Sequence, residues 1–513
     1  MNRPGTMNPI GSLALVLHTH LPWLPGHGRW PVGEEWLYQA WSGSYLRLLA
    51  LLQDAADRGA RDILTLGVSP TIAAMLDDPA CLAAEHTWLG DWQVRAMGMC
   101  AERDELRRRT GQREFVEASW ALGAFEGRWQ RGASPLLRDL AQVGAIEILG
   151  GPLMHPFQPL LQPVTQHAAL TWGLQDAILR RGEQPAGIWA PECGYAPGLE
   201  AIYARAGVTH VMVDGPTMKA AGYDTFAGRT IGASTVVAFA RDLEVTYRVW
   251  SPRRGYPGGK WYRDFHSFDH EWGMRPARVT SLRTPAHLKE PYEPGRAQEA
   301  VRADAADFVD VVRRRMIQSD LARPLVVAGY DTELFGHWWH EGPDWLAEVL
   351  RLLPQAGIQT TTLAQAIADG QVAGSAELSA GSWGSGKDWR VWDGAQVQDL
   401  VQANARLEAR ALASVQATLG TAGSPDSRNQ VLDQLMREVL LGLSSDWAFM
   451  ITKDSATEYA RRRAEEHARR AHDLMDALDA GDGLRAAHLV EQQRLQDWCF
   501  GHLDARLLSS LGR

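Results

Sequence analysis

Four short apolar runs in this chain are each followed at once by histidines or acidic residues. The runs, with the residues that follow them, are Leu13–Leu17 with His18 and His20, Ile146–Leu149 with His155, Gly187–Ala190 with Glu192, and Leu325–Ala328 with Asp331 and Glu333. In parallel α/β barrels the active site is built where the strands end. The pattern therefore predicts that these side chains meet at one site.

The acidic residues fit the carboxylate pair of glycoside chemistry. One carboxylate must be ionised to act as a nucleophile, and the other must stay protonated to donate to the leaving oxygen. Asp331 and Glu333 alternate, so on a continued strand they would share one face. A single acid in such a place could equally be an ion-pair partner, but acids at two strand ends among histidines and tryptophans favour catalysis.

The histidines leave three kinds of site open. His18 and His20 lie two residues apart, so in an extended segment they point the same way. They could form a buried hydrogen-bonded pair, donate to sugar hydroxyls, or bind a metal together with His155. The sequence has no Asp-Asp pair at a strand end, which disfavours a metal-dependent deacetylase or mannosidase.

Tryptophan is unusually frequent, with 21 Trp against 11 Tyr and 11 Phe. These residues could form a Trp-rich core, or flat platforms on which sugar rings stack. The Gly/Ser-rich segment Gly381–Trp392 carries three of them, and such a segment seldom holds large apolar side chains. Further along, Ser444–Trp447 could cap a helix or reach the site with a polar arm.

The elements that would position these residues alternate between strands and helices. The predicted strands are Leu13–Leu17, Ile63–Leu66, Ile146–Leu149, Gly187–Ala190, Thr209–Val213, Val236–Phe239, Val245–Val249 and Leu325–Ala328. Helical patterns such as Trp36–Ala56 and Glu200–Ala206 separate many of them, which predicts a parallel sheet, open or closed as a barrel. Residues 79–138 are mostly helical in pattern and predict an insertion between two strands.

After Gly394 the pattern becomes helical, and no strand-like run follows residue 400. Helices are predicted at 396–419 and 429–443, with an exposed loop at Thr421–Asp426 between them. Ser455–Glu458 has the spacing of a capping box and predicts the start of a helix that continues to about Ala480. An all-helical C-terminal domain is therefore expected.

The composition limits the cellular compartment and the kinds of binding partner that can be expected. The chain has 513 residues, with 52 basic and 61 acidic side chains and a net charge of −9, which argues against a dedicated nucleic-acid or anionic-membrane binder. No apolar run reaches the roughly 18 residues of a membrane helix, and the first run is too short for a signal peptide. The scattered cysteines Cys81, Cys100, Cys193 and Cys499 form no C-x-x-C pair, so we expect reduced thiols and a cytoplasmic protein.

Five segments, in order along the chain, resemble the signature regions of glycoside hydrolase family 57. They are His18–Pro22, Gly150–His155, Trp189–Tyr195, Tyr330–Trp339 and Ser382–Trp392. Further segments resemble the 1,4-α-glucan branching enzymes of that family more than its amylases or pullulanases. They are Gly33–Leu37, Phe239–Asp242, Val249–Ser251, Gly255–Gly258 and Ser445–Trp447.

The resemblance implies an α/β fold: an incomplete (β/α)7 barrel in residues 1–394, with the helical insertion at about 79–138, and an all-helical C-terminal domain in residues 395–513. It also implies retaining glycosyl transfer without metal or other cofactor. The enzyme would cleave α-1,4 bonds and form α-1,6 branches in a glycogen-like glucan. The oligomeric state is not implied.

The resemblance also assigns roles to individual residues. Glu192 would be the nucleophile and Asp331 the general acid/base. The residues that it implies for glucan binding are His18, His20, Trp36, His155, Arg263, Gly273, Trp383, Trp392 and Asp446.

One segment departs from the family pattern. Branching enzymes of this family carry a long loop with a tyrosine that closes over the site, whereas residues 215–235 are shorter here and hold only Tyr223. A shorter lid would expose the glycosyl-enzyme to water and favour hydrolysis. The alternatives are a 4-α-glucanotransferase or α-amylase with the same two acids, a weakly active homologue, or a glucan-binding protein without activity, which the intact acids disfavour.

Overall fold

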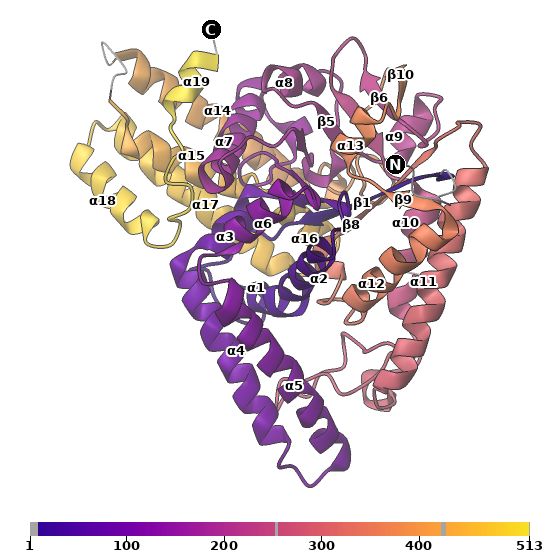
Figure 1. Ribbon diagram of the computed structural model, residues 1–513. Coiled ribbons are helices and arrows are strands. Elements are labelled where there is room, and N and C mark those ends of the chain that lie inside the picture. The colour runs from indigo at the N-terminus through magenta and orange to yellow at the C-terminus, as the bar shows by residue number, and fades with distance from the viewer. Residues whose placement is uncertain (1–8, 252–254, 422–426, 512–513) are drawn as a thin grey trace.

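The computed structural model describes residues 9–251, 255–421 and 427–511, which form a mixed α/β region and a helical C-terminal region (Figure 1). The strands of the described residues are β1 Gly11–Thr19, β2 Leu64–Val68, β3 Ile146–Leu149, β4 Gly187–Ile188, β5 His210–Val213, β6 Gly228–Ile231, β7 Val237–Ala240, β8 Leu325–Asp331, β9 Ile358–Thr360 and β10 Val372–Ala376. One sheet has the order β3-β2-β1-β8, with β9 also paired to β1, and the other has the order β10-β6-β7-β5-β4.

β1 is the centre of the first sheet and pairs in parallel with β2, β8 and β9. All of its residues are buried. Parallel sheets are covered on both faces, which explains why the middle of β1, Leu13–Leu17, is apolar at every position instead of alternating. The two sheets are joined at two points: Trp189 N donates to Gly150 O at 2.9 Å, and Asp242 N donates to Val327 O at 2.7 Å.

Seven of the predicted strands are present, with ends that differ by up to three residues. The predicted strand Val245–Val249 is wrong, because these residues belong to helix α10, Leu243–Val249. The Asp242 side chain accepts from the amides of Glu244 and Val245, and this N-cap starts a helix despite the β-branched residues that follow. Strands β6, β9 and β10 escaped prediction because each is short and contains polar or glycine residues.

Helices α4, Pro79–Met99, and α5, Glu105–Arg128, form a hairpin arm that projects from the α/β region (Figure 1). Helix α6, Ala133–Gln142, leads back to β3, so the predicted helical character of this segment is confirmed. The other helices of the α/β region are α1 Glu34–Ala40, α2 Leu46–Asp57, α3 Pro70–Asp77, α7 Pro163–Arg181, α8 Leu199–Arg205, α9 Gly215–Ala220, α11 Pro294–Ile317, α12 Gly342–Leu352 and α13 Leu363–Ala368.

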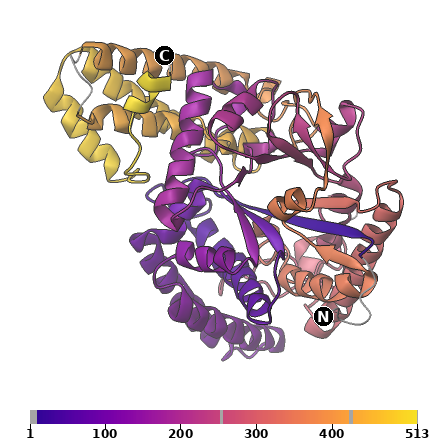
Figure 2. The ribbon, with the colours of Figure 1, turned by 45° about the horizontal axis from the view of Figure 1, so that its top comes forward.

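The C-terminal helices lie to one side of the strands, beside α7 (Figure 2). They are α14 Gln398–Thr421, α15 Gln430–Gly442, α16 Ser445–Thr452, α17 Thr457–Asp479, α18 Gly483–Arg494 and α19 Arg506–Leu511. The predicted capping box is wrong: α17 follows Ala456, and no side chain caps its first turn. Of the predicted loop Thr421–Asp426, Thr421 ends α14, and the other residues lie outside the described part of the chain.

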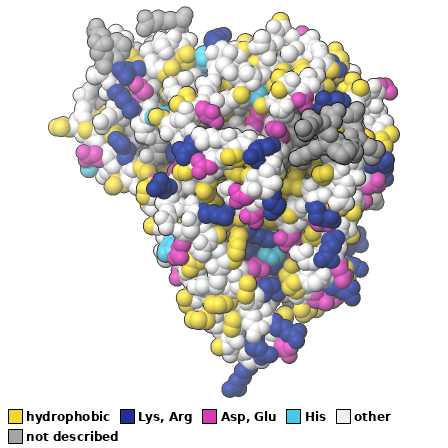
Figure 3. Space-filling view, viewed as in Figure 1, with side chains coloured by type: hydrophobic (Ala, Val, Ile, Leu, Met, Phe, Trp, Pro, Cys, Tyr) yellow, Lys and Arg dark blue, Asp and Glu magenta, His cyan; other side chains and the backbone are white. Residues whose placement is uncertain are grey.

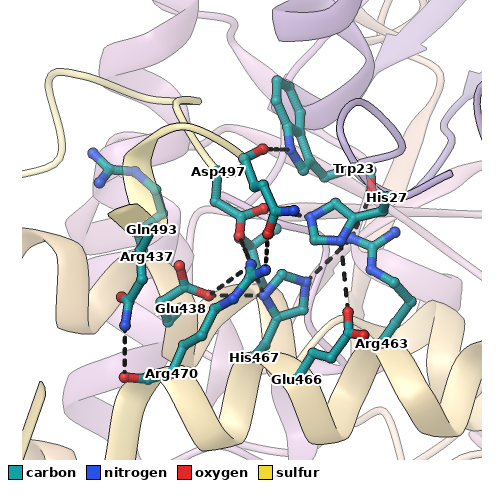
Figure 4. A network of polar contacts seen from close by, with 12 residues as sticks. Trp23, His27, Arg437, Glu438, Arg463, Glu466, His467, Arg470, Gln493 and Asp497 are labelled. Carbon is teal, nitrogen blue, oxygen red and sulfur yellow. Dashed lines mark hydrogen bonds and ion pairs between the residues drawn. The ribbon is translucent and has the colours of Figure 1, made fainter. Parts of the chain in front are cut away.

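A buried polar network fixes the C-terminal region against the segment that follows β1 (Figure 4). His27 Nε2 lies 2.8 Å from Asp497 Oδ1, and Arg463 Nη2 donates to the carbonyl oxygen of Trp23 at 2.8 Å. Because His18 and His20 lie just before this segment, the network also fixes the site that they belong to. None of the helices in the described residues is both long and apolar enough to cross a membrane.

Candidate active site

Asp331 and His18 lie side by side at the carboxyl ends of β8 and β1, where they are partners in the strand register. β8 ends at Asp331, and Thr332–Leu334 forms a 3-10 turn. The expectation that Asp331 and Glu333 share a strand face is therefore wrong. The turn brings Glu333 to the hydroxyl of Tyr45, which donates to Glu333 Oε1 at 2.5 Å.

Glu192 lies in a strained turn after β4. Its φ is 63°, and that of Cys193 is 48°, a left-handed conformation that costs about 1–3 kcal/mol for residues with a side chain. Two donors hold its carboxylate: Ser445 Oγ donates to Oε1 at 2.7 Å, and Trp383 Nε1 donates to Oε2 at 2.8 Å. The strain and the paired donors together fix the direction in which the carboxylate points.

His155 has the same left-handed conformation, with a φ of 53°, and lies between His18 and Glu192. Its Nε2 lies 3.0 Å from His18 Nε2, and its Nδ1 lies 3.0 Å from Ser445 Oγ and 4.0 Å from Glu192 Oε1. His18 is also the register partner of Asp331, so the structure brings His18, His155 and Glu192 together beside the strand end that carries Asp331.

His20 connects the strand ends to the C-terminal helices. Its Nδ1 lies 2.8 Å from Ser69 Oγ, and its Nε2 lies 3.0 Å from Asp446 Oδ2 in the first turn of α16. Its ring stacks on that of His155 with centroids 3.7 Å apart. The segment around Asp446 is therefore an arm that reaches the site, one of the two possibilities that the sequence left open.

Burial raises the pKa of both proposed catalytic carboxyls. The pKa of Glu192 rises to about 7, although the hydrogen bonds from Ser445 and Trp383 work in the opposite direction. Burial raises the pKa of Asp331 to about 6, against the lowering effect of Arg241 and His20. The nearby His20 lowers the pKa of both carboxyls, so one imidazole acts on both groups.

The pKa values of the neighbouring titratable groups are shifted in different directions. Burial, followed by the charge of Asp331, raises the pKa of Glu333 to about 8, so Glu333 is protonated at neutral pH. Burial would also raise the pKa of Asp446, but the charge of His20 and its hydrogen bond outweigh burial and lower it to about 2. Burial, with the charges of the other histidines, lowers the pKa of His18 and His155 well below the usual range, so both are neutral.

Three charged residues beside the acids escaped prediction. Arg241 follows β7 and donates from Nε to Asp214 Oδ1 at 2.9 Å, and Lys387 Nζ lies 2.9 Å from Asp214 Oδ2. Asp214 follows β5, so the strand-end rule that identified Glu192 would also have found Asp214 and Arg241. Lys387 carries no such signal, because it lies in an irregular loop.

The predicted tryptophans occupy different environments. The Trp383 ring lies edge-on to Trp189, with the Arg241 guanidinium 5.0 Å from its centroid. Trp392 is only 1% exposed, and its ring stacks on Phe157 with centroids 4.9 Å apart. Trp36 is half-buried on α1 and packs against the core.

Arg263 and Gly273 lie against the helical arm. Arg263 Nη1 donates to Glu114 Oε1 of α5 at 2.8 Å. Gly273 has a φ of 73°, and a Cβ there would lie 2.1 Å from Arg95 Nη1 of α4. No contact among the described residues joins either one to Glu192 or Asp331.

Tyr223 lies at the edge of the second sheet. The guanidinium of Arg229 lies 3.8 Å above its ring, and 36% of its surface is exposed. The segment that contains it forms α9 and β6, and β6 pairs with both β7 and β10. Residues 215–235 are thus largely built into the α/β region, and Tyr223 makes no described contact with Glu192.

His20, His155 and Asp446 are also the residues here that could hold a metal ion, since one ligand atom from each lies within 4.8 Å of the others. Both ring nitrogens of His20 are already within hydrogen-bond distance of Ser69 and Asp446. A metal ion would have to displace at least one of these contacts.

Comparison with known proteins agrees with this site. The family model described as "Glycosyl hydrolase family 57" matches residues 14–379, and the model described as "1,4-alpha-glucan branching enzyme, C-terminal" matches residues 405–508. A probable 1,4-alpha-glucan branching enzyme of Mycobacterium tuberculosis is 52% identical over 97% of this chain and 98% of its own. The structure of a GH57-type branching enzyme from Pyrococcus horikoshii matches with a TM-score of 0.90 and 29% identity over 97% of each chain. The α-amylase AmyC of Thermotoga maritima matches with a TM-score of 0.84 and 26% identity over 97% of this chain and 99% of its own. The chain therefore belongs to glycoside hydrolase family 57.

Proposed function

We propose that this protein is a retaining 1,4-α-glucan branching enzyme that carries the transferred glucan on Glu192. The observation that carries the proposal is the double hydrogen bond to Glu192, in which Trp383 comes from the α/β region and Ser445 from the C-terminal helices. The match of residues 405–508 to the C-terminal region of branching enzymes, and the relative from Mycobacterium tuberculosis, support the same activity.

The scaffold in this proposal is an incomplete (β/α)7 barrel. Its ring consists of the strands β1, β2, β3, β4, β5, β7 and β8. The bonds from Trp189 to Gly150 and from Asp242 to Val327 support closure, while the sparse pairing at these two seams makes the barrel incomplete. The barrel domain covers residues 1–394, with the arm inserted at about 79–138, and the helical domain covers residues 395–513.

In the first step, ionised Glu192 attacks the anomeric carbon on the non-reducing side of an α-1,4 bond. The bond from that carbon to the leaving oxygen breaks, and the oxygen takes the proton of Asp331. Ser445 and Trp383 favour the ionised form of Glu192 by donating to it. His20 and Asp446, which are partly accessible, bind hydroxyls of the sugar at the cleavage point.

In the second step, the Asp331 carboxylate takes the proton of a 6-hydroxyl from an acceptor chain. The acceptor oxygen bonds to the anomeric carbon, and Glu192 leaves, so the configuration is retained. Water in place of the acceptor gives hydrolysis. Because residues 215–235 fold onto the second sheet, and because AmyC is an α-amylase, hydrolysis is a second activity of the same site.

Glu192→Gln tests the nucleophile. The amide keeps the shape of the carboxyl group but cannot attack, so turnover should disappear while binding of amylose persists. Glu183→Gln, an exchange at an exposed acid, is the matched control and should keep parental activity. Branching by Glu192→Gln near the parental rate would refute the assignment.

Asp331→Ala tests the acid/base. The variant should turn over natural glucans very slowly, but it should keep the first step for substrates whose leaving group needs no proton.

Chelation tests the metal alternative: dialysis against EDTA should leave activity unchanged. Activity that is lost on dialysis and restored by zinc would assign His20, His155 and Asp446 to a metal instead.

A further inference from the structure

A groove with a volume of about 440 Å³ lies between α2, α5 and α6. α2 starts directly after Tyr45, the residue that contacts Glu333, and Asp54 at the far end of the groove lies about 12 Å further along the helix. No residue that lines the groove is among the described partners of Glu192 or Asp331. The groove is thus a separate feature, of a size typical of small-molecule sites.

The walls of the groove combine an aromatic face with polar groups of both kinds. Trp120 of α5 is 45% exposed, whereas most of the other tryptophans in the described residues are more deeply buried. Asp54 offers an acceptor and Arg128 offers donors, and neither side chain has an ion-pair or hydrogen-bond partner among the described residues. Their charges cancel, so the groove has no preference for an anion or a cation.

Gly123 keeps the middle of the groove open. It lies on α5 between Trp120 and Arg128, and a Cβ built on it would meet no atom within 4 Å. Ala124 and Leu136, which are only partly buried, contribute apolar surface to the groove. A neutral ligand with flat C–H faces and many hydroxyls fits such a lining, and a sugar chain has both.

We propose that this groove is a second glucan-binding site, which holds another stretch of the α-1,4-glucan that the active site cleaves. Trp120 stacks against a sugar ring, while Asp54 and Arg128 bind its hydroxyls. The proposal rests on the proposed function, since that function supplies the polymer. A chain bound at both places stays at high effective concentration near Glu192, so the site favours long glucans over short ones.

Hydrophobic side chains are also exposed elsewhere on the arm (Figure 3), among them Val94, Met97 and Val116. These residues do not line the groove. These residues could instead contact a second copy of the chain. Sedimentation velocity distinguishes such self-association from glucan binding.

Two variants change the groove in opposite ways. Trp120→Ala removes the platform, and Gly123→Trp fills the open space. Gly127→Trp is the matched control, because Gly127 is one turn further along α5, also has nothing within 4 Å of a built Cβ, and lies outside the lining. Replacing an exposed helical glycine favours the helix, so both tryptophan variants should fold.

The measurements are mobility in native gels that contain glycogen, KM and kcat on amylose, and sedimentation velocity. Trp120→Ala and Gly123→Trp should each weaken glycogen retardation and raise KM for amylose by about three- to tenfold, with kcat and sedimentation unchanged. Gly127→Trp should match the parent in every measurement.

Unchanged glycogen retardation in both groove variants would overturn the proposal. An equal loss in Gly127→Trp would do the same, and so would a change from dimer to monomer with unaltered glycogen affinity. The retardation needs no catalysis, so it tests the groove even if the parent forms no α-1,6 bonds, a result that would refute only the proposed function.

Discussion

Glu192 and Asp331 both have raised pKa values and share His20 as a neighbour. Their pKa values, raised by burial to about 7 and about 6, lie close together, and His20 acts on both. The productive form has Glu192 ionised and Asp331 protonated, whatever the order in which the two protons leave.

A narrow bell-shaped dependence of kcat/KM on pH follows, with a maximum between about 6 and 7. At lower pH Glu192 gains a proton and is no longer a nucleophile, and at higher pH Asp331 loses the proton that it must donate. Initial rates on amylose at fixed ionic strength measure the profile. A plateau that continues past about pH 9 would contradict the assignment of Asp331 as the acid.

Trp383 acts through its indole N–H, and Trp383→Phe separates that role from stacking. The phenyl ring keeps an aromatic face but cannot donate to Glu192 Oε2, so the pKa of Glu192 should rise and kcat should fall. Trp389→Phe is the matched control in the same loop, since the indole N–H of Trp389 donates to Gly381 O and not to Glu192. If Trp383→Phe kept the parental kcat, and if the acid limb of its kcat/KM profile stayed at the parental pH, Trp383 would act only as a stacking platform.

Helix α16 delivers Ser445 and Asp446 to the strand ends. Ser445 is its first residue, and the backbone N–H of Ser445 donates to His155 O at 3.0 Å. The C-terminal helices therefore complete the environment of Glu192 and do not merely cover it.

Ser445→Ala should move the acid limb of kcat/KM to higher pH. The lost hydrogen bond favours the ionised carboxylate, so its removal raises the pKa of Glu192. The activity near neutral pH should fall about tenfold, as expected for a hydrogen bond to a charged group. Ser445→Thr should restore part of it, and Ser455→Ala, at an exposed position, should have no effect. An acid limb at the parental pH would show that the hydrogen bond from Ser445 does not set the pKa of Glu192.

The strands that carry the site were predictable because they are buried on both faces and end in polar residues. β1 and β8 each contain an apolar run followed by polar residues, so the placement of His18 and Asp331 near strand ends follows from the sequence, although β8 continues three residues past its predicted end. The left-handed conformation of Glu192 has no such signal, since it is imposed by the surrounding contacts. Likewise, the bond from Ser445 to Glu192 joins residues 253 positions apart, and no local pattern encodes such a contact.

At the level of the whole molecule, the active site depends on how the two regions are held together. Asp497 faces both His27 and Arg470, while His467 Nδ1 lies 2.8 Å from Glu438 Oε2 (Figure 4). Burial would raise the pKa of Asp497, but the hydrogen bond from His27 and the nearby positive charges lower it to about 2. Asp497 is therefore ionised at neutral pH.

Asp497→Ala should lower the free energy of unfolding by about 3–5 kcal/mol, because it removes the buried carboxylate that contacts both Arg470 and His27. Activity should fall in parallel, since α16 would lose its fixed position. Asp479→Ala is the control: its partner Arg410 is on the surface, and such pairs contribute about 0–1 kcal/mol. Denaturant unfolding measures both variants, and equal losses would contradict the structural role of the network.

The most direct test of the account is to incubate the protein with amylose and count two products by proton NMR: α-1,6 bonds and new reducing ends. Branching moves a chain from one hydroxyl to another and creates no reducing end, whereas hydrolysis creates one for each bond cleaved. We expect α-1,6 bonds in excess of new reducing ends, with a measurable share of hydrolysis because residues 215–235 fold onto the sheet. Reducing ends without any α-1,6 bonds would identify a hydrolase and contradict the proposed branching activity.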